Sequence, residues 1–298
     1  MSVKRTRLFA RRVDGWDSWK AALQTPGALE PLAAAIFEHE GCRRGRLTRL
    51  HATNAVFRRG EYVLKVYVPR EAGFSPEVDC ARERAGMQGA RAAGLRLPRE
   101  AAFGVFYDRY DFFYLITEAI EGRELSRGLT GMTWTQREAA GAALRAAIDA
   151  LHESAVRVGG EDMARASLDN ERWNAFSPAF NAERRAYVSG LEGLKSVFCH
   201  GDVNGRNALV CPDGRLALID FGDCCDAPAW YDHAAAFGTL GADPAFFRGY
   251  FQDGVDVEKC LQGLLIGDFG ADWILARFGA VPSLARLRAQ IAGASGKG

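Results

Sequence analysis

The sequence feature that most restricts the possible fold is a set of three polar residues at fixed spacing around two short apolar runs. Asp202 and Asn207 precede the apolar stretch 208–211, and Asp220 follows the apolar stretch 216–219. This order predicts two short strands whose flanking loops carry the three side chains. Carboxylate and carboxamide oxygens are the ligands that Mg²⁺ prefers, and a further carboxylate can orient a hydroxyl and accept its proton. The pattern therefore predicts a metal-and-hydroxyl site built on loops.

The character of the chain changes near residues 118–124. Before this point, runs of β-branched and aromatic residues predict strands, and one helix opens at Pro76 and stops at Gly94. After it, Ala-rich stretches with apolar residues at helical spacing predict mainly helices. The expected strands are 46–51, 54–59, 61–68, 101–106 and 111–117, and the clearest later helices are 135–152 and 182–191. We expect an α+β fold of two lobes with a cleft between them, a small antiparallel-sheet N-lobe and a mainly helical C-lobe. The domains are an N-terminal extension packing on the N-lobe (1–45), the N-lobe (46–119) and the C-lobe (120–298).

Composition excludes several classes of protein. The 298 residues are 48% apolar and 25% charged, as in ordinary globular proteins. The 38 Lys and Arg nearly balance the 37 Asp and Glu, which argues against a general nucleic-acid binder. No apolar run reaches the roughly 18 residues of a membrane-spanning helix, and no secretory signal is visible, so we expect a cytoplasmic protein. The seven cysteines contain no Cys-x-x-Cys pair and are expected to be reduced, mostly buried thiols.

The polar loops match a known family pattern. His200-Gly201-Asp202-x-x-x-x-Asn207 followed by Ile219-Asp220-Phe221-Gly222-Asp223 resembles the aminoglycoside phosphotransferase and choline kinase branch of the protein-kinase-like superfamily. Further matching segments appear in the family's order between about residues 46 and 240. They are Val63–Tyr67 (strand lysine), Ala81–Arg84 (helix glutamate), Gly94–Pro98, Leu115–Gly122 (hinge), Ala150–His152, and Pro228 with Tyr231-Asp232.

The resemblance implies an ATP- or GTP-dependent small-molecule kinase that uses Mg²⁺. Asp202 is then the catalytic base, and Asn207 with Asp220 holds the metal ion. Lys65 grips the α- and β-phosphates, and Glu83 orients it. His200 is expected to brace the loop from below.

Two further parts of the nucleotide site follow from the same resemblance. Backbone groups near Glu118 and Ala119 are expected to bind adenine. The phosphate-covering turn 50–55 contains no glycine, so side-chain donors of Thr53 and Asn54 are expected to replace bare backbone there.

The candidate region for binding the acceptor is an acidic, aromatic-rich segment. Residues 220–272 hold ten Asp and Glu against only Arg248 and Lys259. Such a segment either forms a pocket for a cationic, hydroxylated ligand or consists of solvated helix faces over an aromatic core. Candidate substrate-contacting residues are Asp223, Asp232, Trp230 and Trp273. For Asp223 and Asp232 two roles stay open, support of the 200–207 loop or lining of the acceptor pocket.

The leading hypothesis is an O-phosphotransferase acting on an aminoglycoside or related antibiotic, hence a resistance enzyme. The alternatives are a lipopolysaccharide-core or other sugar kinase and, in another class, an inactive kinase-like binding module. The expected partners are a small hydroxylated substrate and a nucleoside triphosphate, without nucleic acid or a membrane span. The oligomeric state stays open.

Overall fold

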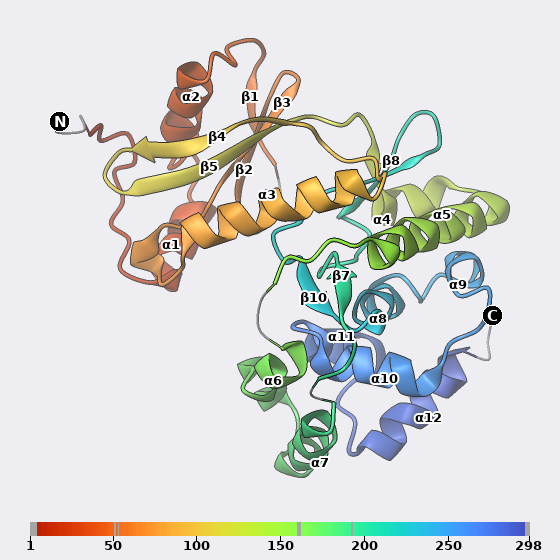
Figure 1. Cartoon of the computed structure of the whole chain (residues 1–298). Coiled ribbons are helices and arrows are strands. Elements are labelled where there is room, and N and C mark those ends of the chain that lie inside the picture. The colour runs from red at the N-terminus through yellow and green to blue at the C-terminus, as the bar shows by residue number, and fades with distance from the viewer. Residues whose placement is uncertain (1–4, 51, 53, 160–161, 192, 296–298) are drawn as a thin grey trace. The chain divides into compact units, whose positions relative to one another are not determined.

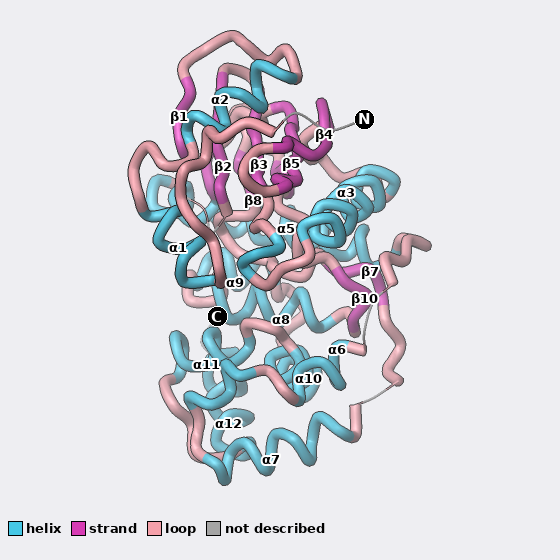
Figure 2. Tube along the Cα trace, turned by 90° about the vertical axis from the view of Figure 1, so that its left-hand side faces the viewer, coloured by secondary structure: helices cyan, strands magenta, loops and turns pink. Residues whose placement is uncertain are grey.

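The structure is a computed structural model that describes residues 5–50, 52, 54–159, 162–191 and 193–295 (Figure 1). Contacts divide the chain into two compact units: unit 1 comprises residues 1–84 and 98–120, and unit 2 comprises 85–97 and 121–298. The strands β1–β5 (magenta in Figure 2) belong to unit 1, whereas unit 2 is mostly helical. The predicted α+β architecture, a sheet-containing N-terminal part followed by a helical C-terminal part, is confirmed. None of the helices in the described residues is both long and apolar enough to cross a membrane.

The sheet of unit 1 is antiparallel throughout, with the strand order β1-β2-β3-β5-β4. Its strands are β1 (Leu47–Arg49), β2 (Ala55–Arg59), β3 (Tyr62–Val66), β4 (Glu100–Tyr107) and β5 (Asp111–Glu118). Both predicted hairpins form. The first turns at Gly60, whose φ of 61° lies in the left-handed region that glycine adopts without strain. The short β3 is central, between β2 and β5.

One face of this sheet is buried by the N-terminal segment, to which the sequence assigned no helix or strand. Alternate residues of the strands point to this face, as the two-residue period of a strand requires. They are Ala55, Phe57, Leu64, Val66, Phe112, Tyr114 and Ile116. Helices α1 (Trp16–Gln24) and α2 (Glu30–His39) contribute Trp19, Leu32, Ile36 and Phe37 to the same core. The segment from Phe9 to Phe37 thus contributes to the hydrophobic core of unit 1.

Helix α3 (Pro76–Ala92) begins in unit 1 and ends in unit 2. Two glycines let its second half pack closely: a Cβ on Gly86 would lie 2.6 Å from Cys224 Sγ, and one on Gly89 would lie 2.7 Å from Val156 Cγ1. Residues 85–97 therefore group with unit 2, whereas the sequence predicted an N-lobe over the whole of 46–119. A short 3-10 turn, η1 (Arg70–Ala72), precedes the helix and contacts α1.

Unit 2 combines small antiparallel ribbons with helices. Strands β6 (Arg123–Glu124), β8 (Ala208–Val210) and β9 (Leu216–Leu218) form one ribbon, and β7 (Val197–Cys199) pairs with β10 (Cys225–Ala227). The helices and 3-10 turns are α4 (Leu125–Gly128), η2 (Leu129–Gly131), α5 (Trp134–Glu153), α6 (Met163–Leu168), η3 (Glu171–Ala175), α7 (Pro178–Ser189), α8 (Trp230–Thr239), α9 (Pro244–Tyr250), α10 (Val257–Ile266), α11 (Gly270–Phe278) and α12 (Leu284–Ser295). Helix α5 packs on α9, and α8 packs on α10. The ribbons hold the polar loops between β7 and β10.

Candidate active site

Lys65 and Glu83 meet in unit 1. Lys65 lies on β3 and faces away from the core residues Leu64 and Val66, as strand alternation requires. Its Nζ is 2.7 Å from Glu83 Oε2 of α3, and both side chains are almost buried. A buried lysine needs such a partner because an unpaired charge away from water is costly. The helix glutamate and the strand lysine thus form the ion pair that the sequence motif anticipated.

The turn between β1 and β2 carries one of the two residues expected to donate to phosphate, Asn54. Leu50 N donates to Val56 O at 2.9 Å, which closes the end of the β1–β2 pair. Asn54 is half-buried beside this turn. Thr53, the second residue expected to replace a glycine donor, lies outside the described residues.

The hydrogen bonds at the end of β5 reduce the number of backbone groups that could bind adenine. Glu118 N donates to Arg99 O at 2.8 Å, and Ala119 N donates to Glu61 O at 2.7 Å. The Glu118 carboxylate also accepts from Arg99 Nε at 3.0 Å. Because both amide N–H groups are already bonded inside unit 1, they are not donors for a nucleobase. Only other backbone groups of this segment, such as those of Ile120 where the chain leaves the sheet, can serve.

The 200–207 loop of unit 2 holds Asp202 by one oxygen. Asn207 Nδ2 donates to Asp202 Oδ2 at 2.8 Å and to the Asp202 carbonyl at 3.0 Å. Asn204 shapes the turn between them, since its Oδ1 accepts from the amides of Arg206 at 2.8 Å and Asn207 at 3.2 Å. Within the described residues, Asp202 Oδ1 receives no hydrogen bond. The loop therefore fixes the carboxylate and leaves one oxygen able to accept from a hydroxyl. Sequence reasoning missed Asn204, although its Asn-Gly context is typical of a turn.

The 219–223 loop brings Asp220 next to this arrangement. Ile219 N donates to Asn207 O at 3.0 Å, which ties the two loops together. Asp220 is exposed and has a φ of 62°, a left-handed backbone that no other non-glycine residue adopts in the described chain. Such strain persists only where the surroundings enforce it and is common at functional sites. Because the Asn207 amide nitrogen faces Asp202, its Oδ1 is directed away, and with the Asp220 carboxylate it offers the hard oxygen donors that fit Mg²⁺.

Gly201 allows the two loops to touch. Its φ is 89°, and a Cβ there would lie 1.8 Å from the Asp223 carbonyl oxygen, so no other residue fits. The buried His200 ring lies beneath this contact. Its Nδ1 accepts from Asp202 N at 3.3 Å, so Nε2 carries the proton and donates to Ile219 O at 3.1 Å. His200 thus braces the loop, as its position in the sequence suggested.

Asp232 supports the 200–207 loop from inside unit 2. It is completely buried; its Oδ1 accepts from Gly201 N at 3.0 Å, and its Oδ2 accepts from His200 N at 2.8 Å. His152 Nε2 lies 3.1 Å from the same Oδ2. Burial alone would raise the pKa of Asp232, but the hydrogen bonds and charge of His152 and His200 hold it below the ordinary value. Of the two roles expected for Asp232, contact with substrate needs correction, because the side chain has no exposed atoms. It supports the loop instead, as an anchor for its backbone.

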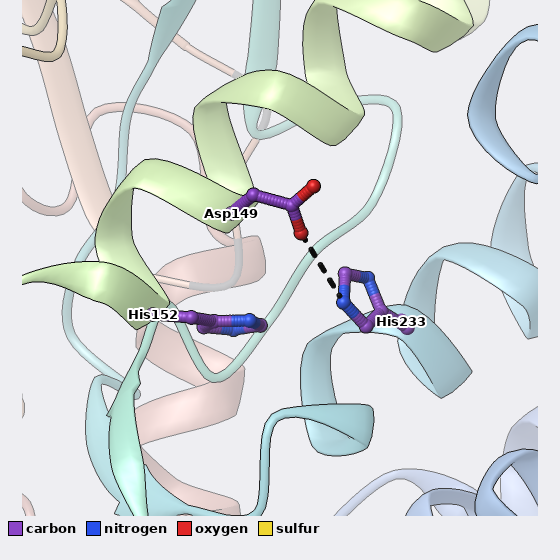
Figure 3. A group of neighbouring side chains, drawn as sticks. All are labelled: Asp149, His152 and His233. Atoms are coloured by element: carbon purple, nitrogen blue, oxygen red, sulfur yellow. Dashed lines mark ion pairs between the residues drawn. The ribbon is translucent and has the colours of Figure 1, made fainter.

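A polar network continues from His152 (Figure 3). Asp149 and His152 come from α5 and face His233 of α8, whose Nε2 is 3.5 Å from Asp149 Oδ1. Burial, together with the charges of His152 and Arg145, lowers the pKa of His233 to about 3, so its imidazole is neutral at physiological pH. The three residues have metal-ligand chemistry and lie close together. However, Arg145 Nε donates to both Asp149 oxygens at 2.9 and 2.7 Å, and His233 Nδ1 is 3.0 Å from the Tyr250 hydroxyl. The cluster is therefore a hydrogen-bonded support and not an open metal site.

The remaining substrate candidates differ in how much surface they expose. Asp223 is exposed in the 219–223 loop. Trp230 is half-buried and packs on His233 and Phe251. Trp273 is buried against Gly238, so it has little surface for a ligand.

The acid-rich segment 220–272 is not a single open acidic patch. Several of its carboxylates cap helices or pair with arginines from elsewhere in the chain, which offsets the local surplus of charge. Such ion pairs are Asp243–Arg137 at 2.9 Å, Glu258–Arg288 at 2.8 Å and Asp272–Arg172 at 2.6 Å. The interpretation as helix faces over an aromatic core accounts for most of this segment.

The expected inert thiols are buried. Cys199, Cys211 and Cys224 have buried side chains, and Cys225 is half-buried. Burial, with the nearby Asp232 carboxylate, raises the pKa of the Cys199 thiol well above its usual value. A protonated, enclosed thiol is neither a nucleophile nor a metal ligand.

Comparison with known proteins gives the family. The profile of the phosphotransferase enzyme family, APH, matches residues 46–264. No curated protein sequence matches the chain.

Solved structures share the fold at low identity. Choline kinase LicA from Streptococcus pneumoniae has a TM-score of 0.56 at 17% identity, over 89% of this chain and 98% of that one. Aminoglycoside phosphotransferase APH(3'')-Id from Streptomyces rimosus, in complex with ADP and streptomycin, has a TM-score of 0.53 at 20% identity, over 90% and 98%. The GDP and kanamycin complex of APH(2")-IIia has a TM-score of 0.60 at 14% identity, over 89% and 96%. Because the family profile spans well over half of the sequence, the chain belongs to the phosphotransferase enzyme family and has its kinase-like fold.

Proposed function

We propose that the protein transfers the γ-phosphate of ATP to a hydroxyl group of a small molecule. The observation that carries this proposal is the 200–207 loop: Asn207 holds one oxygen of Asp202 at 2.8 Å, and the other oxygen is left to accept from a hydroxyl. Membership of the phosphotransferase enzyme family supports the same reaction class. GTP is the alternative donor, since related structures carry ADP or GDP.

In this proposal, Asp202 orients the acceptor and takes its proton. The acceptor oxygen forms a bond to the γ-phosphorus as its hydrogen passes to Asp202. The bond between the γ-phosphorus and the β–γ bridging oxygen breaks, and ADP leaves with that electron pair. Most of the rate then comes from positioning and charge neutralisation, because a loose transition state needs little covalent chemistry.

Lys65 and Glu83 would hold the nucleotide phosphates. The ammonium group of Lys65 carries three N–H donors, and its Nζ lies 2.7 Å from Glu83 Oε2. In this role Glu83 keeps the lysine in place and Lys65 binds the α- and β-phosphate oxygens. Asn54 remains a candidate donor to the phosphates from the β1–β2 turn.

Asn207 and Asp220 would hold the Mg²⁺ ion. When bound, the ion supplies a charge that neutralises the phosphate oxygens. The chain's own contribution is the orientation of Asn207 Oδ1, fixed by the bond from its amide nitrogen to Asp202, and the left-handed backbone that presents Asp220. We expect Asp220→Ala to weaken Mg²⁺-dependent nucleotide binding, as measured by calorimetry with and without Mg²⁺. Unchanged metal dependence would remove Asp220 from the site.

We take an aminoglycoside or related cationic antibiotic as the acceptor. The support is indirect: structures with the same fold are complexes with streptomycin and kanamycin. Another relative in fold is a choline kinase, whose name also indicates a cationic, hydroxylated substrate. The dispersed carboxylates of segment 220–272 favour exposed acids near the site, such as Asp223, over a broad acidic pocket.

A substrate panel tests the proposal. Purified protein is incubated with Mg²⁺ and γ-labelled ATP or GTP, and with aminoglycosides, spectinomycin, choline or sugars of the lipopolysaccharide core, and labelled products are separated. The expected result is label on an aminoglycoside, together with raised resistance when the chain is expressed in a sensitive bacterium. Label on a sugar or on choline would keep the phosphotransferase and replace the acceptor. No transfer to any acceptor and no nucleotide binding would identify a kinase-like binding module instead.

A further inference from the structure

A third residue, Tyr67, contacts the Lys65–Glu83 pair through its hydroxyl group. The Tyr67 hydroxyl donates to Glu83 Oε2 at 2.7 Å, the same oxygen that lies 2.7 Å from Lys65 Nζ. Lys65 Nζ also lies 5.6 Å from the centre of the Tyr67 ring. Tyr67 therefore contacts both members of the pair at once.

The backbone fixes Tyr67 in this position. Tyr67 immediately follows β3, and its amide donates to Phe113 O of β5 at 2.9 Å, which extends the ladder between these strands. Lys65 and Tyr67 are two residues apart in extended chain and point to the same face of the sheet. Tyr67 is 3% exposed and Glu83 is 5% exposed, so the hydroxyl and the carboxylate meet away from water.

We propose that Tyr67 is a positioning residue for nucleotide binding: its hydroxyl holds the Glu83 carboxylate, and the carboxylate in turn fixes the Lys65 ammonium group in the position from which it binds phosphate oxygens. This inference rests on the proposed function, because it assumes that Lys65 binds phosphate. Without the hydroxyl, Glu83 Oε2 would depend on Lys65 as its donor. Sharing the ammonium group with a phosphate would then weaken the interaction that compensates for the burial of this carboxylate, which is costly.

Protonation of Tyr67 agrees with the donor role. Burial, followed by the adjacent Glu83 charge, raises the pKa of the Tyr67 phenol far above its usual value. The phenol therefore keeps its proton at physiological pH and donates it to the Glu83 carboxylate.

The test separates phosphate binding from nucleoside binding. Tyr67→Phe removes one oxygen and keeps the ring, so the core packing is preserved. We expect the affinity for Mg²⁺-ATP to fall about tenfold, as for the loss of a hydrogen bond to a charged group, with adenosine binding unchanged. In the Glu83→Gln background the same substitution should have a much smaller effect, since a residue that acts through Glu83 is not additive with it. Tyr67→Met, which also lacks a hydroxyl, serves if the phenylalanine variant cannot be purified.

Tyr114→Phe is the matched control. Tyr114 is also a buried tyrosine of the same sheet whose hydroxyl donates to a carboxylate, that of Glu40. Its loss should lower thermal stability and leave ATP affinity unchanged. Equal ATP affinity of Tyr67→Phe and the parent would overturn the inference while leaving the proposed function intact. Equal losses for ATP and adenosine would also overturn it, because they would indicate general damage to unit 1. Absence of ATP binding in the parent would instead refute the proposed function itself.

Discussion

Asp232 shows how single residues set the geometry of the candidate active site. Its two oxygens accept from the consecutive amides of His200 and Gly201, so the backbone immediately before Asp202 is held by one buried carboxylate. His152 donates to the same carboxylate and links it to α5. A buried charge of this kind persists only when its hydrogen bonds are satisfied. The 200–207 loop is therefore positioned by buried residues on its inner side.

The buried His233 gives a prediction for pH. Its pKa is lowered to about 3, whereas the unfolded chain binds a proton near pH 6.5. Because the unfolded state takes up the proton first, the contribution of His233 to stability is complete above about pH 6.5 and is lost progressively as the pH falls. We expect His233→Asn to remove a slope of up to about 1.4 kcal/mol per pH unit from the free energy of unfolding between about pH 6.5 and 4. Urea unfolding at several pH values measures it. His39→Asn, at an exposed site on α2, is the control, and parallel curves for parent and His233→Asn would refute the assignment.

At the scale of elements, the second half of α3 depends on glycines that propensity alone would replace by alanine. Alanine in a helix interior is favoured over glycine by about 1 kcal/mol. A Cβ on Gly89 would, however, lie 2.7 Å from Val156 Cγ1 and 3.1 Å from the ring of Phe198. Gly293 of α12 has no atom within 4 Å of the same position.

Replacing these two glycines by alanine should change the free energy of unfolding in opposite directions. We expect Gly89→Ala to destabilise the protein by about 1–3 kcal/mol through overpacking, and Gly293→Ala to stabilise it by up to about 1 kcal/mol. Chemical denaturation of the two variants beside the parent measures both. Stabilisation by Gly89→Ala would mean that α3 does not pack on Phe198 and Val156 as described.

Strands and helices were predicted correctly where the apolar residues follow a single strand or helix period. The β2–β3 and β4–β5 hairpins, α3 and α5 were predicted to within a residue or two at most of their ends, because their alternation, glycine turns and Pro76 are local signals. Helices α1 and α2 were not predicted, since their apolar residues bury against a sheet whose strands all come later in the chain. The Lys65–Glu83 contact followed from motif order. The roles of Tyr67 and His152 depend on tertiary neighbours, and no local pattern in the sequence indicates them. For Asp232 the sequence left open whether it supports the loop or lines a pocket, because that choice depends on its burial.

At the scale of the whole molecule, the N-terminal segment is tied into unit 1 by one buried carboxylate. Asp108, in the turn between β4 and β5, accepts from Thr6 Oγ1 at 2.6 Å, Leu8 N at 2.7 Å and Phe9 N at 2.9 Å. It has no exposed surface. The ring of Phe9 packs edge-on against the ring of Phe112, with the two ring centroids 5.5 Å apart. The segment Thr6–Phe9 is therefore held against the core that supports the sheet carrying Lys65.

Removing this carboxylate should loosen unit 1. We expect Asp108→Ala to cost about 2–4 kcal/mol of unfolding free energy, because it leaves buried amides without acceptors. The neighbouring Asp111 pairs with Arg5 at the surface, and Asp111→Ala should cost less than about 1 kcal/mol. Thermal unfolding of the two variants makes the comparison. Similar small losses for both would show that the N-terminal segment is not held through Asp108.

The central claim, that Asp202 carries phosphoryl transfer in a working enzyme, is tested most directly by turnover and nucleotide affinity in one variant. Asp202→Asn keeps the shape of the side chain and removes the base, and Asp213→Asn makes the same change at an exposed acid on the β8–β9 turn. We predict that Asp202→Asn lowers turnover by about a thousandfold while ATP affinity stays within about threefold, and that Asp213→Asn behaves as the parent. Turnover of Asp202→Asn within about tenfold of the parent would contradict the proposed mechanism.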